Sequence, residues 1–370
     1  RHPSSSRGAL AFCELWWNFD SYPVFRVWYS DVGAYSPKDN VVIFRIIFLT
    51  LLLVPVSTYA VEYADRAEVQ AFVKELSAKE SFDEVELLAI FSQAEYKQNI
   101  IDAITRPAER TLNWAKYQDI FLTERRTVSG IEFMEKNRVA LDAAYEVYGV
   151  PPVIVTAIIG VETMYGRIAG NYRVLDALAT LSFDYPPRSK FFKRELGEFI
   201  LLAREEKKIM TELKGSYAGA MGLGQFIPSS YRAYAVDFDG DGFRDIWNNP
   251  IDAIGSVANY LARHGWQRDQ QITFEVDGTD MPADLFNVSL KPSTSIAALR
   301  TLGMADDSRG FESEQSVTPM RLMGKQGEEF WIGLKNFYVI TRYNHSKLYA
   351  MAVFQLSESL REASGNVPAR

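Results

Sequence analysis

One glutamate ends a markedly apolar segment. Glu162 follows Val153-Ile-Val-Thr-Ala-Ile-Ile-Gly-Val161, nine residues that are almost all apolar, and such a run indicates a helix buried on nearly all sides. Burial raises the pKa of a carboxyl group, and the negative end of the helix dipole acts in the same direction. A carboxyl group of this kind suits a general acid at neutral pH. A glutamate that reaches the surface or pairs with an arginine fits this segment equally well.

A second segment is dense in glycine. Gly215-Ser-Tyr-Ala-Gly-Ala-Met-Gly-Leu-Gly-Gln-Phe-Ile-Pro228 holds four glycines within ten residues, yet it matches neither a P-loop nor a dinucleotide-binding fingerprint. Glycines at this density let a ligand or another backbone approach closely. Ser216 and Gln225 add neutral hydrogen-bonding groups of the kind that orient sugars. A flexible loop is the alternative, but the embedded apolar side chains argue against it.

A third segment is acidic and resembles a calcium-binding loop. It begins with the D-x-D-x-D-G pattern of an EF-hand, and four aspartates within nine positions would repel one another without a cation. Asparagine at position 12 replaces the bidentate glutamate, so we expect weak Ca²⁺ binding. A solvated acidic turn is the alternative. The predicted ligands are Asp237, Asp239, Asp241, the backbone carbonyl of Phe243, Asp245 and Asn248.

Composition excludes several other classes of site. The chain has 370 residues, a net charge of −7 and a pI near 5.3, and it lacks the basic stripe that nucleic-acid binding needs. A single cysteine, Cys13, cannot form an internal disulfide. The three histidines are dispersed, and neither H-E-x-x-H nor C-x-x-C occurs, which argues against a zinc hydrolase. No G-x-S-x-G nucleophile motif is present either.

The elements that would carry these residues are mostly helical. Pro151-Pro152 opens the helix that contains Glu162, because proline is tolerated in a first helical turn. We also predict a capping box at Ser81–Glu84 before a helix to Phe91, and Asp252 as the N-cap of a helix that ends before Gly265. Alternating residues predict β-strands at 272–276 and between 320 and 331. The remaining predicted helices are 67–76, 131–148 with Gly149 as its C-terminal glycine, 191–203 and 346–362.

The N-terminal region has the pattern of a targeting segment. Residues 46–56 form an apolar run that follows Arg45 and precedes Ser57-Thr-Tyr-Ala60, so we interpret residues 41–60 as a signal peptide cleaved after Ala60. A membrane anchor is the alternative, although the run is shorter than the ~20 apolar residues of a spanning helix. Residues 1–40 have no helical or strand period, and we treat them as an upstream extension outside the folded protein.

Five separated motifs together resemble one family. Gly160-Val-Glu-Thr-Met-Tyr-Gly166 and the Gly215–Tyr231 segment look like those of the membrane-bound lytic murein transglycosylase B family, in the lysozyme-like superfamily. Three further matches, in consistent order, extend the resemblance over residues 65–365: Leu175–Ser182, Asp252–Tyr260 and Thr341–Ser346. The family's membrane-bound members carry a lipid-attached cysteine, which this sequence lacks at the end of its apolar run.

The resemblance implies an α+β, mainly helical fold with a lysozyme-like core. In that fold an N-terminal helical section (61–130) precedes the catalytic core with its EF-hand-like loop (131–266). A small antiparallel β section (267–335) follows, and a return segment with the C-terminal helix (336–370) completes the core.

The resemblance also implies an activity and its site. Glu162 would cleave the β-1,4 bond between N-acetylmuramic acid (MurNAc) and N-acetylglucosamine (GlcNAc) without water, leaving a 1,6-anhydro ring; a hydrolytic muramidase and a catalytically silent peptidoglycan-binding protein are the alternatives. Arg188 fits a contact to acidic stem peptides, although Pro187 replaces an expected second arginine. Tyr117 and Tyr349 have the least support as groove residues. The residues expected to contact sugar are Ser216, Gln225, Tyr117, Tyr260, Tyr338, Tyr343 and Asn344.

The expected setting follows from the same resemblance. We expect a periplasmic monomer that acts on glycan strands with peptide stems, does not bind nucleic acid and joins complexes of cell-wall synthesis or hydrolysis. One structural calcium ion would be its cofactor.

Overall fold

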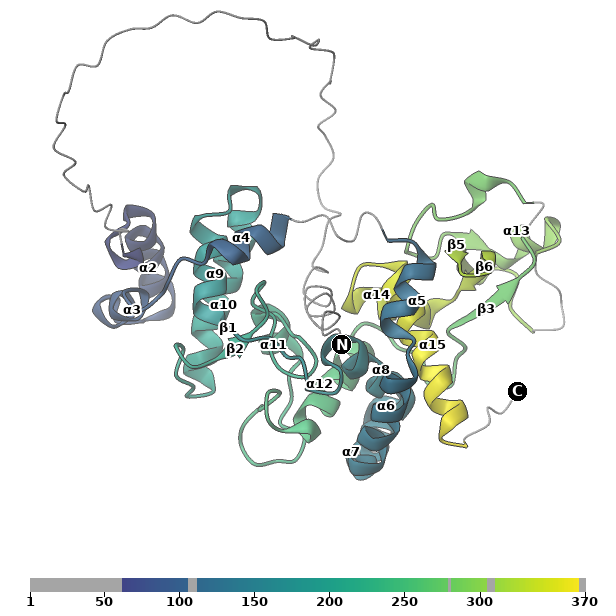
Figure 1. Ribbon diagram of the computed structural model, residues 1–370, viewed down its shortest axis with the longest axis horizontal. Helices are drawn as coiled ribbons and strands as arrows, with labels where there is room; N and C mark the ends of the chain where they lie inside the picture. Colours follow the sequence, from purple (N-terminus) through teal and green to yellow (C-terminus); the bar gives the residue numbers. More distant parts are fainter. Residues whose placement is uncertain (1–61, 106–111, 279–280, 305–309, 366–370) are drawn as a thin grey trace, which may run out of the picture.

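The computed structural model describes residues 62–105, 112–278, 281–304 and 310–365. Helices α2 and α3 lie at one end of the molecule and a β-sheet lies at the other, beside α13; most of the remaining helices lie between them (Figure 1). The expected extension (1–40) and signal-like segment (41–60) lie outside the described residues. The arrangement confirms the α+β, mainly helical fold class.

Helices form most of the described chain. In chain order they are α2 (Ala67–Glu80), α3 (Glu84–Phe91), α4 (Gln98–Thr105), α5 (Trp114–Phe121), α6 (Glu124–Lys136), α7 (Arg138–Tyr148), α8 (Pro152–Thr163), α9 (Val174–Phe183), α10 (Ser189–Glu205), α11 (Pro228–Tyr234), α12 (Pro250–Arg263), α13 (Ile296–Thr301), α14 (Lys335–Tyr343) and α15 (Lys347–Ala363). The strands are β1 (Tyr172–Arg173), β2 (Lys214–Gly215), β3 (Thr273–Val276), β4 (Thr294–Ser295), β5 (Ser316–Gly324) and β6 (Gly327–Gly333).

Two predicted helix caps are wrong. Ser81 ends α2 in a left-handed conformation, and Asp83 caps α3 by accepting the backbone N–H groups of Val85 and Glu86 at 2.7 and 3.0 Å. Asn249 caps α12, whereas Asp252 lies buried inside that helix. In both cases the polar side chain nearest the first free N–H groups takes the capping role.

The predicted helix 131–148 is divided. Helices α6 and α7 meet at Asn137, whose side-chain amide donates a hydrogen bond to the Phe133 carbonyl at 2.8 Å. The backbone N–H of Asn137 donates to the same carbonyl at 3.0 Å, and the residue departs from helical geometry with a φ of −112° and a ψ of 20°. Gly149 then ends α7 with a φ of +70°, and Pro152 opens α8; both boundaries agree with the prediction.

Helix α8 lies at the centre of the fold. Every residue from Val153 to Thr163 is buried, and α6, α7, α12 and α15 all pack against the helix. The main hydrophobic cluster runs from Tyr63 to Leu360, so the N-terminal helices and the core share one interior. The expected boundary at residue 130 falls inside α6.

A four-stranded antiparallel sheet forms the other end of the molecule, in the order β3-β6-β5-β4. One of its faces carries Met320 and Leu322 and joins the main hydrophobic cluster. The opposite face carries Phe330 and Ile332 and belongs to a second cluster, which extends from Phe274 to Leu334. The predicted strands are therefore present, and they connect a small separate interior to the larger one.

The chain returns to the core through α14 and α15. Ser346 caps α15, which agrees with the predicted C-terminal helix. Within the described residues, no single helix combines the length and apolar character of a membrane span. Helices α7 and α8 together meet that test by length and composition, but they are bent by 114°.

Candidate active site and acidic loop

Glu162 occupies the last turn of α8 and is nearly enclosed. Its exposed fraction is 7%, and the Tyr349 hydroxyl donates a hydrogen bond to its Oε1 at 2.6 Å. Tyr349 comes from the first turn of α15, 187 residues further along the chain. The packing of α15 on α8 therefore brings the two side chains together.

Burial dominates the protonation of Glu162. Removal from water raises the pKa of this carboxyl from 4.5 to about 8, and the Tyr349 hydrogen bond, which favours the charged form, offsets only part of that rise. Burial also raises the pKa values of Tyr343 and Tyr349 well above 10.0, so both phenols stay protonated. The site therefore holds a neutral carboxylic acid at neutral pH.

The turn after Glu162 is strained and closely packed. Met164 and Tyr165 adopt left-handed φ values of 51° and 60°, which are costly for residues other than glycine. The Tyr165 ring folds back over Gly160, where an added Cβ would lie 2.5 Å from the phenol oxygen. This phenol donates a hydrogen bond to the Arg126 carbonyl at 3.0 Å, so the end of α8 is fixed in one conformation.

The glycine-rich segment lies directly against this turn. The Thr163 hydroxyl, next to Glu162 in sequence, donates to the Leu223 carbonyl at 2.8 Å. The Leu223 N–H donates to the Ile246 carbonyl at 2.9 Å. At Gly222, which has a φ of +71°, an added Cβ would lie 2.5 Å from the Ile246 oxygen. Glycine is thus required here because another backbone approaches closely.

Ser216 and Gln225 are both buried in this segment. The Ser216 hydroxyl oxygen accepts the N–H groups of Ala218 and Ala220, at 3.2 and 3.0 Å, and so closes the local turn. Gln225 has a left-handed φ of 52°, and its side-chain NH₂ donates to the Gly222 carbonyl at 3.0 Å. Both side chains shape the loop.

Aromatic side chains from α12, α14 and α15 adjoin the same loop. The Tyr343 hydroxyl donates to the Gly224 carbonyl at 2.5 Å, and its ring lies parallel to that of Tyr349 with centroids 6.5 Å apart. Tyr260 packs edge-on against Tyr343 at 4.8 Å. The side-chain oxygen of Asn344, the next residue, is buried and has no hydrogen-bond partner among the described residues. Such an acceptor suits a ligand donor.

The other expected sugar-contacting residues lie further from Glu162 in the contact network. Tyr117 is buried in α5, and its electrostatic effect reaches Tyr349. Tyr338 is half-buried on α14. Arg188 stands at the start of α10, where it stacks on the Phe191 ring at 4.3 Å. Burial lowers the pKa of Arg188.

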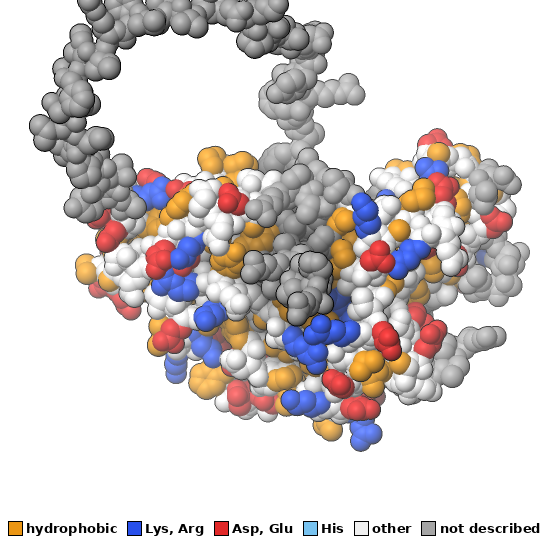
Figure 2. Space-filling view, in the orientation of Figure 1, with side chains coloured by type: hydrophobic (Ala, Val, Ile, Leu, Met, Phe, Trp, Pro, Cys, Tyr) orange, Lys and Arg blue, Asp and Glu red, His pale blue; other side chains and the backbone are white. Residues whose placement is uncertain are grey.

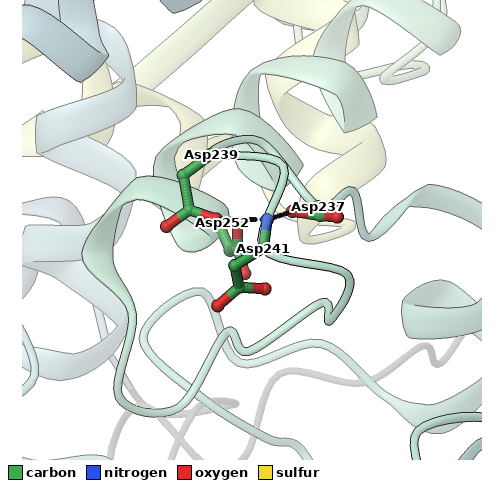
Figure 3. Close-up of side chains that lie close together, drawn as sticks. All are labelled: Asp237, Asp239, Asp241 and Asp252. Atoms are coloured by element: carbon green, nitrogen blue, oxygen red, sulfur yellow. Dashed lines mark hydrogen bonds between the residues drawn. The ribbon is translucent and has the colours of Figure 1, made fainter.

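The acidic loop gathers four carboxylates. Carboxylate oxygens of Asp237, Asp239, Asp241 and Asp252 lie within 4.8 Å of one another (Figure 3). Asp245 is not in the group; its Oδ1 accepts the N–H groups of Trp247 and Asn248. Hard oxygen donors at this spacing fit a calcium ion, so the residues present suit the expected cofactor.

The sequence analysis missed the roles of three residues or gave them little support. Tyr349 had little support because the contact that defines its role joins distant segments. Thr163 carries no signal beyond its place beside Glu162. Asp252 looked like an ordinary acid in a first helical turn; in fact its carboxylate accepts the N–H groups of Phe238 and Asp245, each at 2.8 Å, and ties the loop to α12.

A family model covers most of the described chain. The transglycosylase SLT domain matches residues 64–358. The chain belongs to this family. Membrane-bound lytic murein transglycosylase B of Escherichia coli (strain K12) is 42% identical over 308 residues, which cover 81% of this chain and 84% of that protein.

Solved structures resemble this transglycosylase closely. Catenated lytic transglycosylase SltB1 from Pseudomonas aeruginosa is 48% identical with a TM-score of 0.78, over 81% of this chain and 99% of that one. Escherichia coli lytic transglycosylase Slt35, solved in complex with calcium, is 42% identical with a TM-score of 0.74, over 83% and 96%. SltB3 from Pseudomonas aeruginosa, solved with NAG-NAM-pentapeptide, is 31% identical with a TM-score of 0.69, over 79% and 78%.

These similarities confirm the lysozyme-like core and the class of activity. The protein is an enzyme, a peptidoglycan-cleaving lytic transglycosylase.

Proposed function

We propose that Glu162 is the sole acid and base of the reaction, which breaks the MurNAc-β-1,4-GlcNAc bond and leaves a 1,6-anhydromuramic acid end. The observation that carries this proposal is the buried Glu162 carboxyl, whose pKa is raised to about 8 and whose hydrogen-bond donor is Tyr349. A neutral acid of this kind can donate a proton at neutral pH.

The reaction needs one group in two successive states. Neutral Glu162 gives its proton to the glycosidic oxygen as the bond from that oxygen to the muramyl C1 breaks. The resulting carboxylate then accepts the proton of the muramyl C6 hydroxyl while that oxygen bonds to C1. Tyr349 supports the second state, because its hydrogen bond stabilises the charged carboxylate.

The electrostatics of Glu162 support the non-hydrolytic route. A glycosidase that uses water needs a second carboxylate about 5 to 9 Å from the first. Within the described chain, no other carboxylate contributes to the pKa of Glu162. Hydrolysis by a muramidase is the competing outcome, and its product differs from the anhydro product by one water.

We assign sugar binding to the surroundings of the glycine-rich segment. Asn344 offers its unpartnered buried oxygen, and Gln225 lies in the same loop that Tyr343 contacts. Arg188 remains our proposed contact for an acidic peptide stem. The remaining proposed contacts are Ser216, Tyr117, Tyr260 and Tyr338.

We assign a structural calcium site to Asp237, Asp239, Asp241 and Asp252, with the backbone carbonyl of Phe243 as a further ligand. The convergence of the four carboxylates supports this assignment, as does the calcium complex of Slt35. Asp245 and Asn248 are also ligands in the loop pattern, but here we propose that they do not bind the ion directly. Their hydrogen bonds to each other would hold the turn closed. When bound, the ion supplies charge neutralisation and takes no part in bond cleavage.

We place the enzyme in the periplasm, acting on glycan strands with peptide stems. The membrane-bound relative supports this location, and the complex of SltB3 with NAG-NAM-pentapeptide supports stem recognition. On the face shown in Figure 2, basic and acidic side chains are interspersed, as suits a polymer of mixed charge.

Digestion of purified sacculi by matched variants tests the assignment of Glu162. Glu162→Gln should lose about 10²- to 10⁴-fold in activity, because the amide neither donates nor accepts the required proton. Glu195→Gln is the control, because Glu195 is equally buried but accepts the Ser229 N–H in another part of the fold. Equal activity in both variants would remove Glu162 from the mechanism.

A further inference from the structure

One carboxylate joins the β-sheet to the catalytic core. Glu329 of β6 accepts two indole N–H groups at the same oxygen, Oε2, from Trp114 at 3.0 Å and from Trp331 at 3.1 Å. Trp331 lies two residues further along the same strand, so its bond is local. Trp114 is the first residue of α5, 215 residues away in sequence. Of these two indole hydrogen bonds, the one from Trp114 connects the sheet to α5.

The position of this carboxylate is constrained from the other side. An added Cβ on Gly324 would lie 1.9 Å from Glu329 Oε1, so the glutamate occupies the space above that glycine. Gly324 pairs with Gly327 where β5 turns into β6. Glu329 also lies across from Leu322, on the sheet face that joins the main cluster. The acceptor is thus held by its own sheet and directed at α5.

Helix α5 needs such external support. It has eight residues, and helices this short are marginal by themselves in water. It packs against β5 and α15, and the Arg126 guanidinium donates to the Ile120 carbonyl at its C-terminal end, at 3.2 Å. Trp114 anchors the opposite end, where its N–H is bound to Glu329.

The face of α5 that carries Trp114 also carries Tyr117, three residues further along the helix. Tyr117 is 1% exposed, and its ring stacks with that of Trp114 at 6.2 Å. Tyr117 also acts electrostatically on Tyr349, which donates the hydrogen bond to Glu162. Contacts therefore run from Glu329 through Trp114 to Tyr117 on α5, and α5 packs against α15, the helix that carries Tyr349.

We propose that Glu329 is a positioning residue for glycan cleavage, which fixes α5 through Trp114 and so keeps this helix, with Tyr117, packed against α15, the helix that carries Tyr349. The inference rests on the proposed role of Glu162. It gives the β-sheet a task in catalysis: the sheet presents one fixed acceptor that holds the wall of the active site in place.

The expected consequence of losing the link is a wetter active site. Glu162 is faced by the phenol of Tyr349 from α15, and the ring of Tyr343 from α14 lies parallel to that of Tyr349. Tyr117 lies on α5, which packs against α15. Because burial is the main cause of the raised Glu162 pKa, water admitted beside Tyr117 lowers that pKa. The basic limb of the kcat–pH profile, where the acid loses its proton, should then move to lower pH.

Four single variants of the full chain separate the two indole bonds. Glu329→Ala removes the acceptor, whereas Glu329→Gln keeps an oxygen in place. Trp114→Phe removes the indole hydrogen bond between α5 and the sheet, whereas Trp331→Phe removes only the indole hydrogen bond within β6. Hydrogen exchange of the α5 amides and the pH profile of sacculus digestion are measured for each.

We expect Glu329→Ala and Trp114→Phe to speed α5 exchange more than tenfold relative to α8. Both should also move the basic limb down by roughly half to one pH unit, the size expected for partial hydration of a buried acid. Glu329→Gln and Trp331→Phe should stay close to wild type in both measurements.

Three results would overturn the proposal: unchanged α5 exchange in Glu329→Ala, equal effects from Trp331→Phe, or a lowered melting temperature with an unchanged pH profile. The last result would leave Glu329 with a purely structural role. If the wild-type enzyme and Glu162→Gln proved equally active, the proposed function would fail instead, while the exchange data would still report on α5.

Discussion

The carboxyl groups at the end of α8 and in the acidic loop lie in opposite settings. Glu162 is enclosed by apolar residues with one phenol as its hydrogen-bond donor. Asp239 and Asp241 are exposed on a loop, and two further aspartates converge on them. Isolation in an apolar site favours the neutral acid, whereas several carboxylates gathered together favour a bound cation. The same chemical group is therefore proposed for proton transfer in one region and for metal binding in the other.

The two regions are also joined by backbone contacts. Ile246, in the second half of the acidic loop, accepts the N–H of Leu223, and Leu223 in turn accepts the Thr163 hydroxyl beside Glu162. The loop therefore supports the glycine-rich segment, which supports the turn after Glu162. Changes in either region should remain measurable in the other.

The largest expected effect concerns the cost of burying Glu162. Its pKa is about 8 in the folded protein and 4.5 in an ordinary setting, so the folded state binds the proton more tightly. Stability from this group is complete below pH 4.5 and is lost as pH rises through about 8. Relative to Glu162→Gln, the wild type should lose about 3 kcal/mol between pH 4 and pH 7.

Urea unfolding of both proteins at pH 4, 7 and 8.5 checks this expectation, because other titrating groups are common to both. A difference in unfolding free energy that stays constant with pH would show that Glu162 is as hydrated as a surface carboxyl.

Calcium should have the next largest effect, and it should act on the other region. A ligand that binds only the folded state stabilises it by about 2.7 kcal/mol at a hundred times its dissociation constant. The melting temperature should therefore rise with calcium in the wild type. Asp237→Ala combined with Asp241→Ala should abolish that response.

Asp245→Asn provides the matched control for the calcium experiment. Its carboxylate holds the local turn and lies outside the cluster, so the calcium response should persist in this variant. Identical melting curves of the wild type in chelator and in millimolar calcium would reduce the loop to an acidic turn.

The smallest expected effect concerns Tyr349. Tyr349→Phe removes the hydrogen bond that favours the charged form of Glu162, so the pKa of that carboxyl should rise further. The basic limb of the kcat–pH profile should move up by about one pH unit, within the range that one hydrogen bond to a charged group provides. A limb that moves down, or not at all, would mean that Tyr349 does not act on Glu162.

The sequence was most informative where a single segment determines its own secondary structure. The apolar run before Glu162 predicted a fully buried helix, and Gly149 and Pro152 marked its flanks; all three are present in the structure. Alternation of apolar residues likewise predicted β3, β5 and β6. Periodicity and turn chemistry act over a few residues, so they can be read without knowledge of the fold.

Contacts between distant segments could not be predicted in this way. The break between α6 and α7 falls on one residue, Asn137, whose backbone N–H and side-chain amide both donate to the Phe133 carbonyl. Asp252 was predicted as a cap because its position in sequence is typical of one, yet packing turns its carboxylate toward the acidic loop. Tyr349 could be placed beside Glu162 only once α15 was seen to pack on α8. The long amphipathic or apolar helices were predictable, whereas several short ones and the pairings that tune the carboxyl groups were not.

We propose that the single buried carboxyl of Glu162 cleaves glycan strands without water. Mass analysis of muropeptides released from purified sacculi by the wild-type enzyme tests it most directly. A positioned internal hydroxyl has an effective concentration of order 10⁵ M or more, against the ~55 M of water, so ring closure should prevail. We predict 1,6-anhydromuramic acid ends that are one water lighter than lysozyme products and resist borohydride; mainly reducible ends would show that water is the nucleophile.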